Sequence, residues 1–233
     1  MDKKPFEPNF KTPRTDLCRE ENNKLFLHLR NQQVAQEFRD KEKADISWEV
    51  EAIAKSSGVY LEFNRAKTGE GKDWMYLIRI SVTGGGPLTR KQWQIVDDLS
   101  EKYTKDTDGH PSIRFTNRQN IQFHWIKKEN VIDIVKSMAE AGWNSLNGCG
   151  DNTRNVMACP GSRHSDIFNA NAWSHWAGQY FQLPLDPFIQ IFTIDPKYLR
   201  RPGESFEYGP QLLNRKFKIA FGTVHRDPKS GLI

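Results

Sequence analysis

The chain has few cysteines: among its 233 residues only Cys18, Cys149 and Cys159 occur. Three is an odd number, and these three are widely spaced with no CxxC pair. The sequence therefore predicts neither a disulfide framework nor a complete metal site within this chain. His164 and His175 lack the spacing to any cysteine that a zinc site needs.

Long apolar runs and nucleotide-binding loops are also lacking. No stretch approaches the roughly 18 apolar residues that a membrane helix requires, and the N-terminal MDKKPFEPNF contains no apolar signal core. We therefore expect a cytoplasmic protein without a membrane partner. The glycine triplet at 84–86 fits neither GxGxxG nor GxxxxGK[ST]. With 37% hydrophobic and 27% charged residues, the composition is that of a folded globular protein.

The order of the elements that the sequence predicts indicates an α+β fold. Residues 74–82 are apolar and β-branched, as in a central strand, and Thr89 is expected to cap a helix that reaches about residue 103. Trp93, Val96 and Leu99 lie on one face of that helix, which we expect to point inward. Two strands within 112–126 and a helix over 129–141 follow. This β-α-β-β-α order is most of a ferredoxin-like, split βαβ unit.

The sequence divides into three regions. Residues 1–55 are predicted to form an N-terminal arm followed by helices at 24–43 and 45–54. Residues 56–145 hold the ferredoxin-like half-domain. Residues 146–233 begin a further α+β domain, with a helix at 165–182 and strands at 189–194 and 215–221.

Polar side chains alternate with apolar ones along 112–126, which is the period of an extended strand. At Asn117–Gln119 we expect one strand to bend or end and the next to begin. A half-buried edge strand would explain the pattern, but solvated faces favour Thr, Lys and Glu. A rigid donor face without a carboxylate suits a planar ligand rich in carboxylates or phosphates instead. The polar set is Arg114, Thr116, Arg118, Asn120, Gln122 and His124.

Three other places carry positive charge in unusual settings. Arg79 stands in an apolar strand, where it either pairs with Asp97 or Asp98 or faces an anion. The loop 148–155 has two glycines and can direct N–H groups and Arg154 toward one anion, although it also fits a plain connection. In the RKFK segment at 215–218, Lys216 and Lys218 share one face. A basic edge strand can also serve only to prevent aggregation.

The segments RFTNRQNIQFHWI, CGDNTRNVMACP and NRKFK, in this order and spacing, resemble the nitrite and sulfite reductase family that uses sirohaem and a 4Fe–4S cluster. The resemblance covers about residues 58–222 and is closest to the N-terminal half of assimilatory-type sulfite reductases. It implies that residues 146–233 begin a sirohaem/4Fe–4S-type domain. It also implies that this chain binds sirohaem and the substrate anion for the six-electron reduction of sulfite to sulfide.

The resemblance assigns roles to individual residues. The polar set along 114–124 would line or brace sirohaem, and Asn155 and Arg215 would support the macrocycle. Arg79, Arg154, Lys216 and Lys218 would hold the oxyanion. A lysine ammonium can also release a proton when neighbouring cations disfavour its charge, so the lysines are the expected proton donors. Tyr60 resembles a tyrosine that some members crosslink to a cysteine at the position of Cys149.

The chain departs from the family in length and in cysteines. A 4Fe–4S cluster needs four thiolates, so its ligands are expected in a C-terminal half that this sequence lacks. That half, and an electron donor such as ferredoxin or a flavoprotein, are the expected partners. The resemblance implies sulfite as the substrate, since nitrite reductases of the family tend to have Asn at the position of Lys218. Nitrite reduction is the alternative. A non-catalytic scaffold subunit is another. Nucleic-acid binding is remote, since the strands lack an RNP1-like run.

Overall fold

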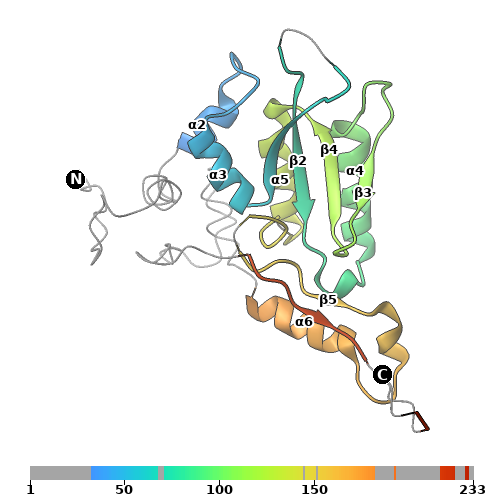
Figure 1. Cartoon of the computed structure of the whole chain (residues 1–233). Coiled ribbons are helices and arrows are strands. Elements are labelled where there is room, and N and C mark those ends of the chain that lie inside the picture. Colours follow the sequence, from blue (N-terminus) through green and yellow to red (C-terminus); the bar gives the residue numbers. More distant parts are fainter. Residues whose placement is uncertain are drawn as a thin grey trace, which may run out of the picture.

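A computed structural model describes residues 33–67, 71–143, 145–150, 152–181, 192, 216–223 and 229–230. The described part contains a four-stranded antiparallel sheet and a two-stranded parallel ribbon. Figure 1 shows helices α4 and α5 behind the sheet, and α6 with the ribbon beyond the lower end of β2. None of the described helices is long and apolar enough to cross a membrane.

The sheet confirms the ferredoxin-like, α+β prediction and completes it with a strand from the N-terminal side. Its order is β1-β2-β4-β3, and every neighbouring pair is antiparallel. In a split βαβ unit the fourth strand follows the second helix; here β1, which precedes the unit, pairs with the central strand β2 instead. The strands are β1 (Val59–Phe63), β2 (Trp74–Ile80), β3 (Ile113–Phe115) and β4 (Ile121–Ile126).

Helix α4 (Arg90–Tyr103) begins at the predicted cap, where Thr89 and Gln92 form a capping box. Val96 and Leu99 are buried as expected. The prediction that Trp93 points inward is wrong: its side chain is 44% exposed and meets the exposed ring of Phe115 edge-on. Helix α5 (Val131–Glu140) follows a 3-10 turn at Lys128–Asn130.

Alternation along the strands separates a core face from a polar face. Tyr76, Ile78 and Ile80 of β2 are buried in the core together with Ile121 and Phe123 of β4. These side chains meet α4 and α5, which supply Val96, Leu99, Ile134, Val135 and Met138. The side chains between them in the sequence therefore lie on the opposite face of the sheet.

The two N-terminal helices are shorter or shifted relative to the prediction. Helix α2 spans Gln33–Arg39, and residues 24–32 lie outside the described part. Helix α3 (Trp48–Ser56) begins after Ser47, whose hydroxyl accepts from the Val50 N–H, so it starts later than residue 45. Glu37 of α2 accepts from the backbone N–H and hydroxyl of Ser47 and ties the two helices together.

The C-terminal elements are also shorter than predicted. Helix α6 (Ala170–Phe181) follows a separate 3-10 turn at Pro160–His164 and packs on the 3-10 turn at Thr83–Gly85. The ribbon pairs β5 (Met157–Ala158) with β6 (Ala220–Phe221), so the strand predicted at 215–221 is extended mainly at its end. The strand predicted at 189–194 lies outside the described residues except for Phe192, which is buried in the core.

Candidate anion-binding site

One cross-strand row brings together two of the predicted arginines. Arg114 of β3 and Arg79 of β2 both pair in register with Gln122 of β4. The three side chains therefore lie next to one another on the face of the sheet opposite α4 and α5. Gln122 is buried, Arg79 half-buried and Arg114 exposed. The row thus has a buried centre at Gln122 and is open to solvent at Arg114.

Gln122 links Arg79 to His124. With its amide oxygen turned toward Arg79, Gln122 accepts from the guanidinium Nε and Nη2. The other end of the amide lies 3.5 Å from His124 Nε2. Burial, together with the charges of Arg114 and Arg79, lowers the pKa of His124 to about 4. His124 is therefore a neutral imidazole at neutral pH.

Arg79 lies between a thiol and an aromatic ring. Its Nη1 donates to Cys149 Sγ at 3.5 Å, and its guanidinium carbon lies 5.3 Å from the centre of the Tyr60 ring. Burial lowers the pKa of Arg79, and the charge of Arg154 adds to this effect. The alternative of an ion pair with Asp97 or Asp98 is wrong. Arg79 takes part in none of the ion pairs among the described residues.

Arg154 reaches the same thiol from the glycine-containing loop. Its Nη1 donates to Cys149 Sγ at 3.3 Å, and its Nε donates to the Gly150 carbonyl at 3.0 Å. A Cβ at Gly148 would collide with the Arg79 carbonyl, so glycine lets the loop lie directly against β2. Asp151 of this loop lies outside the described residues. The loop thus brings the Arg154 guanidinium near the Arg79 guanidinium, since both donate to the same sulfur.

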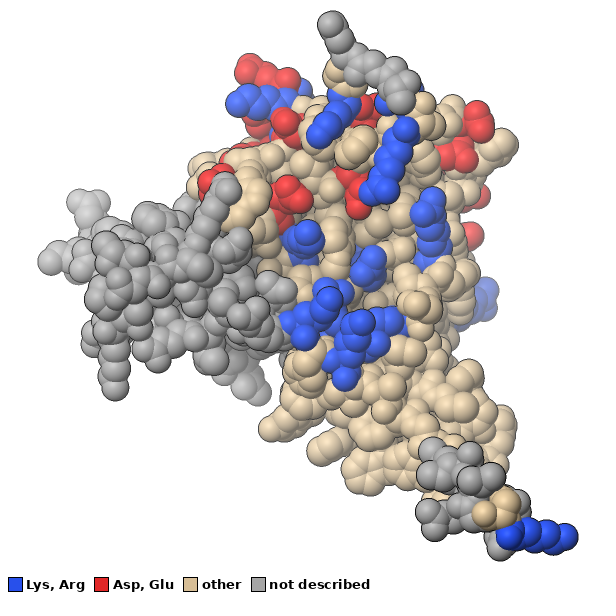
Figure 2. All heavy atoms as spheres, in the orientation of Figure 1, with Lys and Arg blue, Asp and Glu red and all other residues tan. Residues whose placement is uncertain are grey.

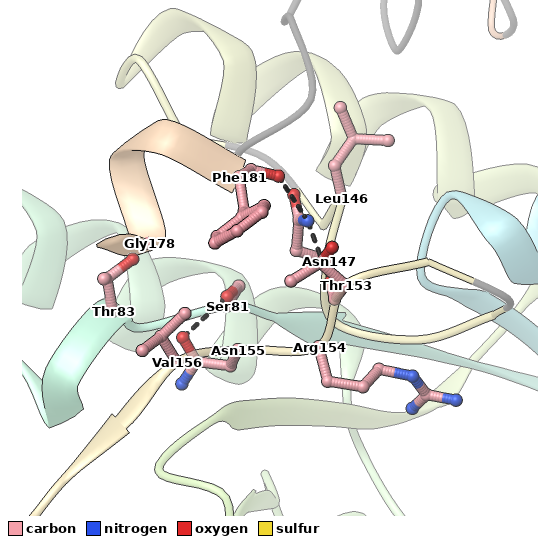
Figure 3. Close-up of a pocket in the computed structure, with 10 residues that line it drawn as sticks. All are labelled: Ser81, Thr83, Leu146, Asn147, Thr153, Arg154, Asn155, Val156, Gly178 and Phe181. Carbon is pink, nitrogen blue, oxygen red and sulfur yellow. Dashed lines mark hydrogen bonds between the residues drawn. The ribbon is translucent and has the colours of Figure 1, made fainter. Parts of the chain in front are cut away.

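A small cavity lies on the other side of the Arg154 backbone. Its lining includes Ser81, Asn147, Asn155 and Phe181, and its volume is about 20 Å³, enough for one water molecule. Figure 3 shows that the Arg154 guanidinium points away from this cavity. The Arg154 guanidinium is therefore presented on the side of the loop opposite to this cavity.

The break at Asn117–Gln119 is a tight turn that joins β3 to β4. Gln119 adopts a left-handed φ of 56°, and Thr116 accepts from the backbone N–H groups of Arg118 and Asn120. Arg118 Nη2 donates to the Asn155 carbonyl at 2.6 Å. Asn155 Nδ2 donates to the carbonyls of Arg118 at 2.9 Å and Val82 at 2.8 Å. The side chains of Thr116 and Asn155 thus stabilise the hairpin turn through hydrogen bonds to the backbone.

Two buried polar atoms in this region lack a protein partner. Among the described residues, the buried side-chain atoms without a hydrogen bond are Arg118 Nε, Asn120 Oδ1 and Asn152 Oδ1. Arg118 and Asn120 belong to the polar set of the hairpin, and Asn120 is only 3% exposed. A buried donor or acceptor without a partner costs free energy that a ligand can recover. These atoms fit a polar ligand placed against the hairpin.

Positive charge gathers on this face without paired carboxylates. The charge of Arg154 is felt by both Arg79 and Arg118, and His124 is affected by Arg79 and Arg114. None of these arginines pairs with a carboxylate among the described residues. Figure 2 shows blue side chains gathered over the lower middle of this face, while the red ones lie mainly toward its upper edge. We call Arg79, Arg114, Arg118 and Arg154 the arginine cluster.

The two predicted lysines lie beside Arg154. The Arg154 N–H donates to the Phe217 carbonyl at 3.0 Å, and Thr153 bridges Phe217 in parallel. Lys216 and Lys218, on either side of Phe217, are exposed. Phe217 packs against Phe181, which lines the cavity, so the lysines point to the other side of the segment, as does Arg154. Arg215 lies outside the described residues.

One group of possible metal ligands lies in the loop between α4 and β3. Among the described residues, Asp106, Asp108 and His110 bring their ligating atoms within 4.8 Å of one another. The conformation of this loop needs no metal ion, because Asp106 accepts hydrogen bonds from the backbone N–H groups of Asp108 and His110. Cys149 is buried and Cys159 exposed, while Cys18 lies outside the described residues.

The sequence did not reveal two residues that position this site. Gln119 donates to the Ala158 carbonyl at 2.7 Å and accepts from the Ala158 N–H, so it pairs with β5 like a strand. The Ser81 hydroxyl donates to Asn155 Oδ1 at 2.9 Å. Ser81 lies within the predicted strand 74–82 and Gln119 at the predicted break in 112–126, and neither position indicates the distant partner of the side chain.

Comparison with known proteins agrees with the fold. The family model of the nitrite/sulfite reductase ferredoxin-like half domain matches residues 68–141. The sulfite reductase [NADPH] hemoprotein beta-components of Shewanella sediminis and Paenibacillus sp. are 30% and 31% identical to this chain, each over 72% of it and 30% of their own length. That of Bacillus subtilis is 29% identical over 77% of this chain and 32% of its own length.

A solved structure shows the same fold. The Mycobacterium tuberculosis NirA protein aligns with a TM-score of 0.52 at 20% identity, over 87% of this chain and 36% of its own. The chain thus spans about a third of the length of the curated relatives that it matches. On its sequence and its fold, this chain belongs to the nitrite/sulfite reductase family.

Proposed function

We propose that this chain forms the sirohaem- and anion-binding part of a sulfite reductase. The arginine cluster carries the proposal. Two of its guanidinium groups lie on one face of the sheet, and those of Arg118 and Arg154 come from the adjoining turn and loop. None of the four pairs with a carboxylate among the described residues, and Arg118 Nε and Asn120 Oδ1 have no partner. Sirohaem is a planar group with eight carboxylates, and guanidinium groups bind carboxylates in a bidentate manner.

In this proposal, Arg114 and Arg118 hold peripheral carboxylates of the tetrapyrrole. Arg114 is exposed at the open end of the row, and Arg118 has a free Nε. Gln122, His124 and Asn120 form the polar floor between them, while Thr116 and Asn155 act indirectly by fixing the hairpin turn. Arg215 is proposed to support the macrocycle on the basis of family resemblance alone. Sirohaem, when bound, supplies the iron through which electrons reach the substrate.

Arg79 and Arg154 are proposed to hold the substrate oxyanion, since both donate to the same sulfur and face one small region. Two guanidinium charges in a partly buried place stabilise a dianion more strongly than at an open surface. Lys216 and Lys218 lie beside Arg154 and are exposed, so they can exchange protons with water. We assign them the delivery of protons as oxygen atoms leave as water.

The partners follow from the same proposal. The three cysteines are too few for a 4Fe–4S cluster, which needs four thiolates. The cluster would therefore be supplied by polypeptide that corresponds to the unmatched two thirds of the relatives, and electrons by a ferredoxin or a flavoprotein. Nitrite is the alternative substrate, and Lys218 is the residue that we expect to discriminate between sulfite and nitrite.

The test uses the full chain loaded with sirohaem and follows the absorbance of the bound group during sulfite and nitrite titrations. We expect saturable shifts, tighter for sulfite, and expect Lys218→Asn to move the ratio of the two affinities toward nitrite. Lys229→Asn, at an exposed position remote from the arginine cluster in sequence, is the matched control. Absence of any anion-dependent shift would contradict the proposal. An unchanged ratio in Lys218→Asn would remove only that residue from the discrimination.

A further inference from the structure

Helix α6 differs from the other helices of the described part in having no charged residue. Its sequence, ANAWSHWAGQYF, contains no Asp, Glu, Lys or Arg. One face is made of small side chains: Ala170, Ser174 and Ala177 are buried, and Gly178 touches Thr83 so closely that a Cβ would collide with it. This small-residue face packs on the turn at Thr83–Gly85 and leaves the other face outward.

The outward face is aromatic and open to solvent. Trp173, Trp176 and Tyr180 are 50%, 61% and 73% exposed, and they follow the i, i+3, i+7 spacing of one helical stripe. Successive rings touch, with centroids 5.9 Å apart for both Trp173–Trp176 and Trp176–Tyr180. Ring contacts extend the row at both ends. We call this row the aromatic stripe; it consists of Phe168, Trp173, Trp176, Tyr180, Phe181 and Phe217.

Single exposed aromatic residues are common, but a continuous row is not. From the exposed fractions and about 150–250 Å² for each aromatic side chain, the stripe offers roughly 500 Å² of apolar surface. Figure 2 shows that the part of the molecule that holds α6 is almost free of charged side chains. A surface of this kind and size marks a protein interface.

We infer that the aromatic stripe binds the same stripe of a second copy of this chain. The whole chain carries a net charge of +5, so two copies repel each other over most surfaces. The stripe has no charge, and therefore two copies can meet there without that repulsion. For the same reason it offers nothing to attract an acidic partner. Two stripes related by a twofold axis bury about 1,000 Å² in total, which is the lower limit for a specific interface.

The contact would lie next to the lysines of the candidate site. Phe217, at one end of the stripe, stands between Lys216 and Lys218 and packs against Phe181. A partner helix on the stripe would therefore cover the side of this segment that faces away from the lysines. Self-association is independent of the proposed function, because no residue of the arginine cluster takes part in it.

Sedimentation velocity of the full chain over a concentration series tests the inference. We expect a reversible dimer and, for Trp176→Glu, a dissociation constant raised at least about tenfold. Tyr180→Lys, at the most exposed ring, is a second variant that should fold without difficulty. Trp93→Glu is the matched control, since Trp93 is also exposed but lies on α4 outside the stripe. It should leave the dimer unchanged, and circular dichroism verifies folding of all three variants.

Three results would overturn the inference. The first is a wild-type chain that stays monomeric at all concentrations, and the second is a dimer that neither stripe variant weakens. The third is binding of the stripe to another part of a reductase. Then the unmatched part of the Bacillus subtilis hemoprotein beta-component would form a one-to-one complex with the wild-type chain, Trp176→Glu would abolish it, and no dimer would be seen.

Discussion

Arg118 and Asn155 hold each other across the turn of the β3–β4 hairpin. The Arg118 guanidinium donates to the Asn155 carbonyl at 2.6 Å, and the Asn155 amide donates to the Arg118 carbonyl at 2.9 Å. Asn155 is 2% exposed and also binds Val82 and Ser81. One asparagine therefore joins the end of β2, the hairpin turn and the loop that carries Arg154.

Asn155→Ala should lower the free energy of unfolding by about 2–4 kcal/mol, because it leaves the buried carbonyls of Val82 and Arg118 without their donor. Urea denaturation measures this change. Asn117→Ala, at an exposed position of the same turn, should change stability by less than about 0.5 kcal/mol. Equal effects of the two substitutions would show that Asn155 does not hold β2, the hairpin turn and the loop together.

Arg154→Ala should weaken sulfite binding to the sirohaem-loaded chain by about 30-fold to 1,000-fold, equivalent to about 2–4 kcal/mol. Its effect on stability should stay near 1 kcal/mol, because the side chain is part-exposed and makes one hydrogen bond to a carbonyl. Anion titration and thermal unfolding measure the two effects. Retained sulfite affinity with a collapsed unfolding midpoint would make Arg154 a structural residue.

His124 should make stability depend on pH in a defined window. The folded chain holds the pKa of His124 near 4, against 6.5 for an unperturbed imidazole. As the pH falls, the unfolded chain takes up the proton first, so the stability that the neutral ring contributes is lost between about pH 6.5 and pH 4. The His124→Gln variant should not show this part of the loss of stability. Parallel curves of unfolding midpoint against pH for the two proteins would contradict the assignment.

The two described cysteines should react at different rates. Cys149 is 2% exposed and burial raises its pKa, although Arg154 acts in the opposite direction. Cys159 is exposed. Iodoacetamide should therefore modify Cys159 well before Cys149 in the native chain, as followed by peptide mass spectrometry. Faster modification of Cys149 would mean that the loop 148–155 opens readily.

Much of the sheet could be predicted from the sequence, because period-two alternation in 74–82 and 112–126 and the cap at Thr89 are local signals. The gathering of Arg79, Arg114 and Arg154 followed from family resemblance and not from periodicity, since register across strands is a non-local property. Trp93 was misplaced because its neighbour Phe115 lies outside the core. The role of Gln119 was hidden, since a turn residue that pairs with a distant strand leaves no pattern in its own segment.

Direct titration of the chain with sirohaem, followed by absorbance, tests whether the arginine cluster is a site for the tetrapyrrole. Arg114→Ala and Arg90→Ala remove the same charge from exposed positions, but only Arg114 lies in the row with Gln122 and Arg79. We predict saturable one-to-one binding that Arg114→Ala weakens about tenfold or more and Arg90→Ala leaves unchanged. Absence of saturable binding, or equal affinities for both variants and the wild-type chain, would contradict the assignment of the arginine cluster.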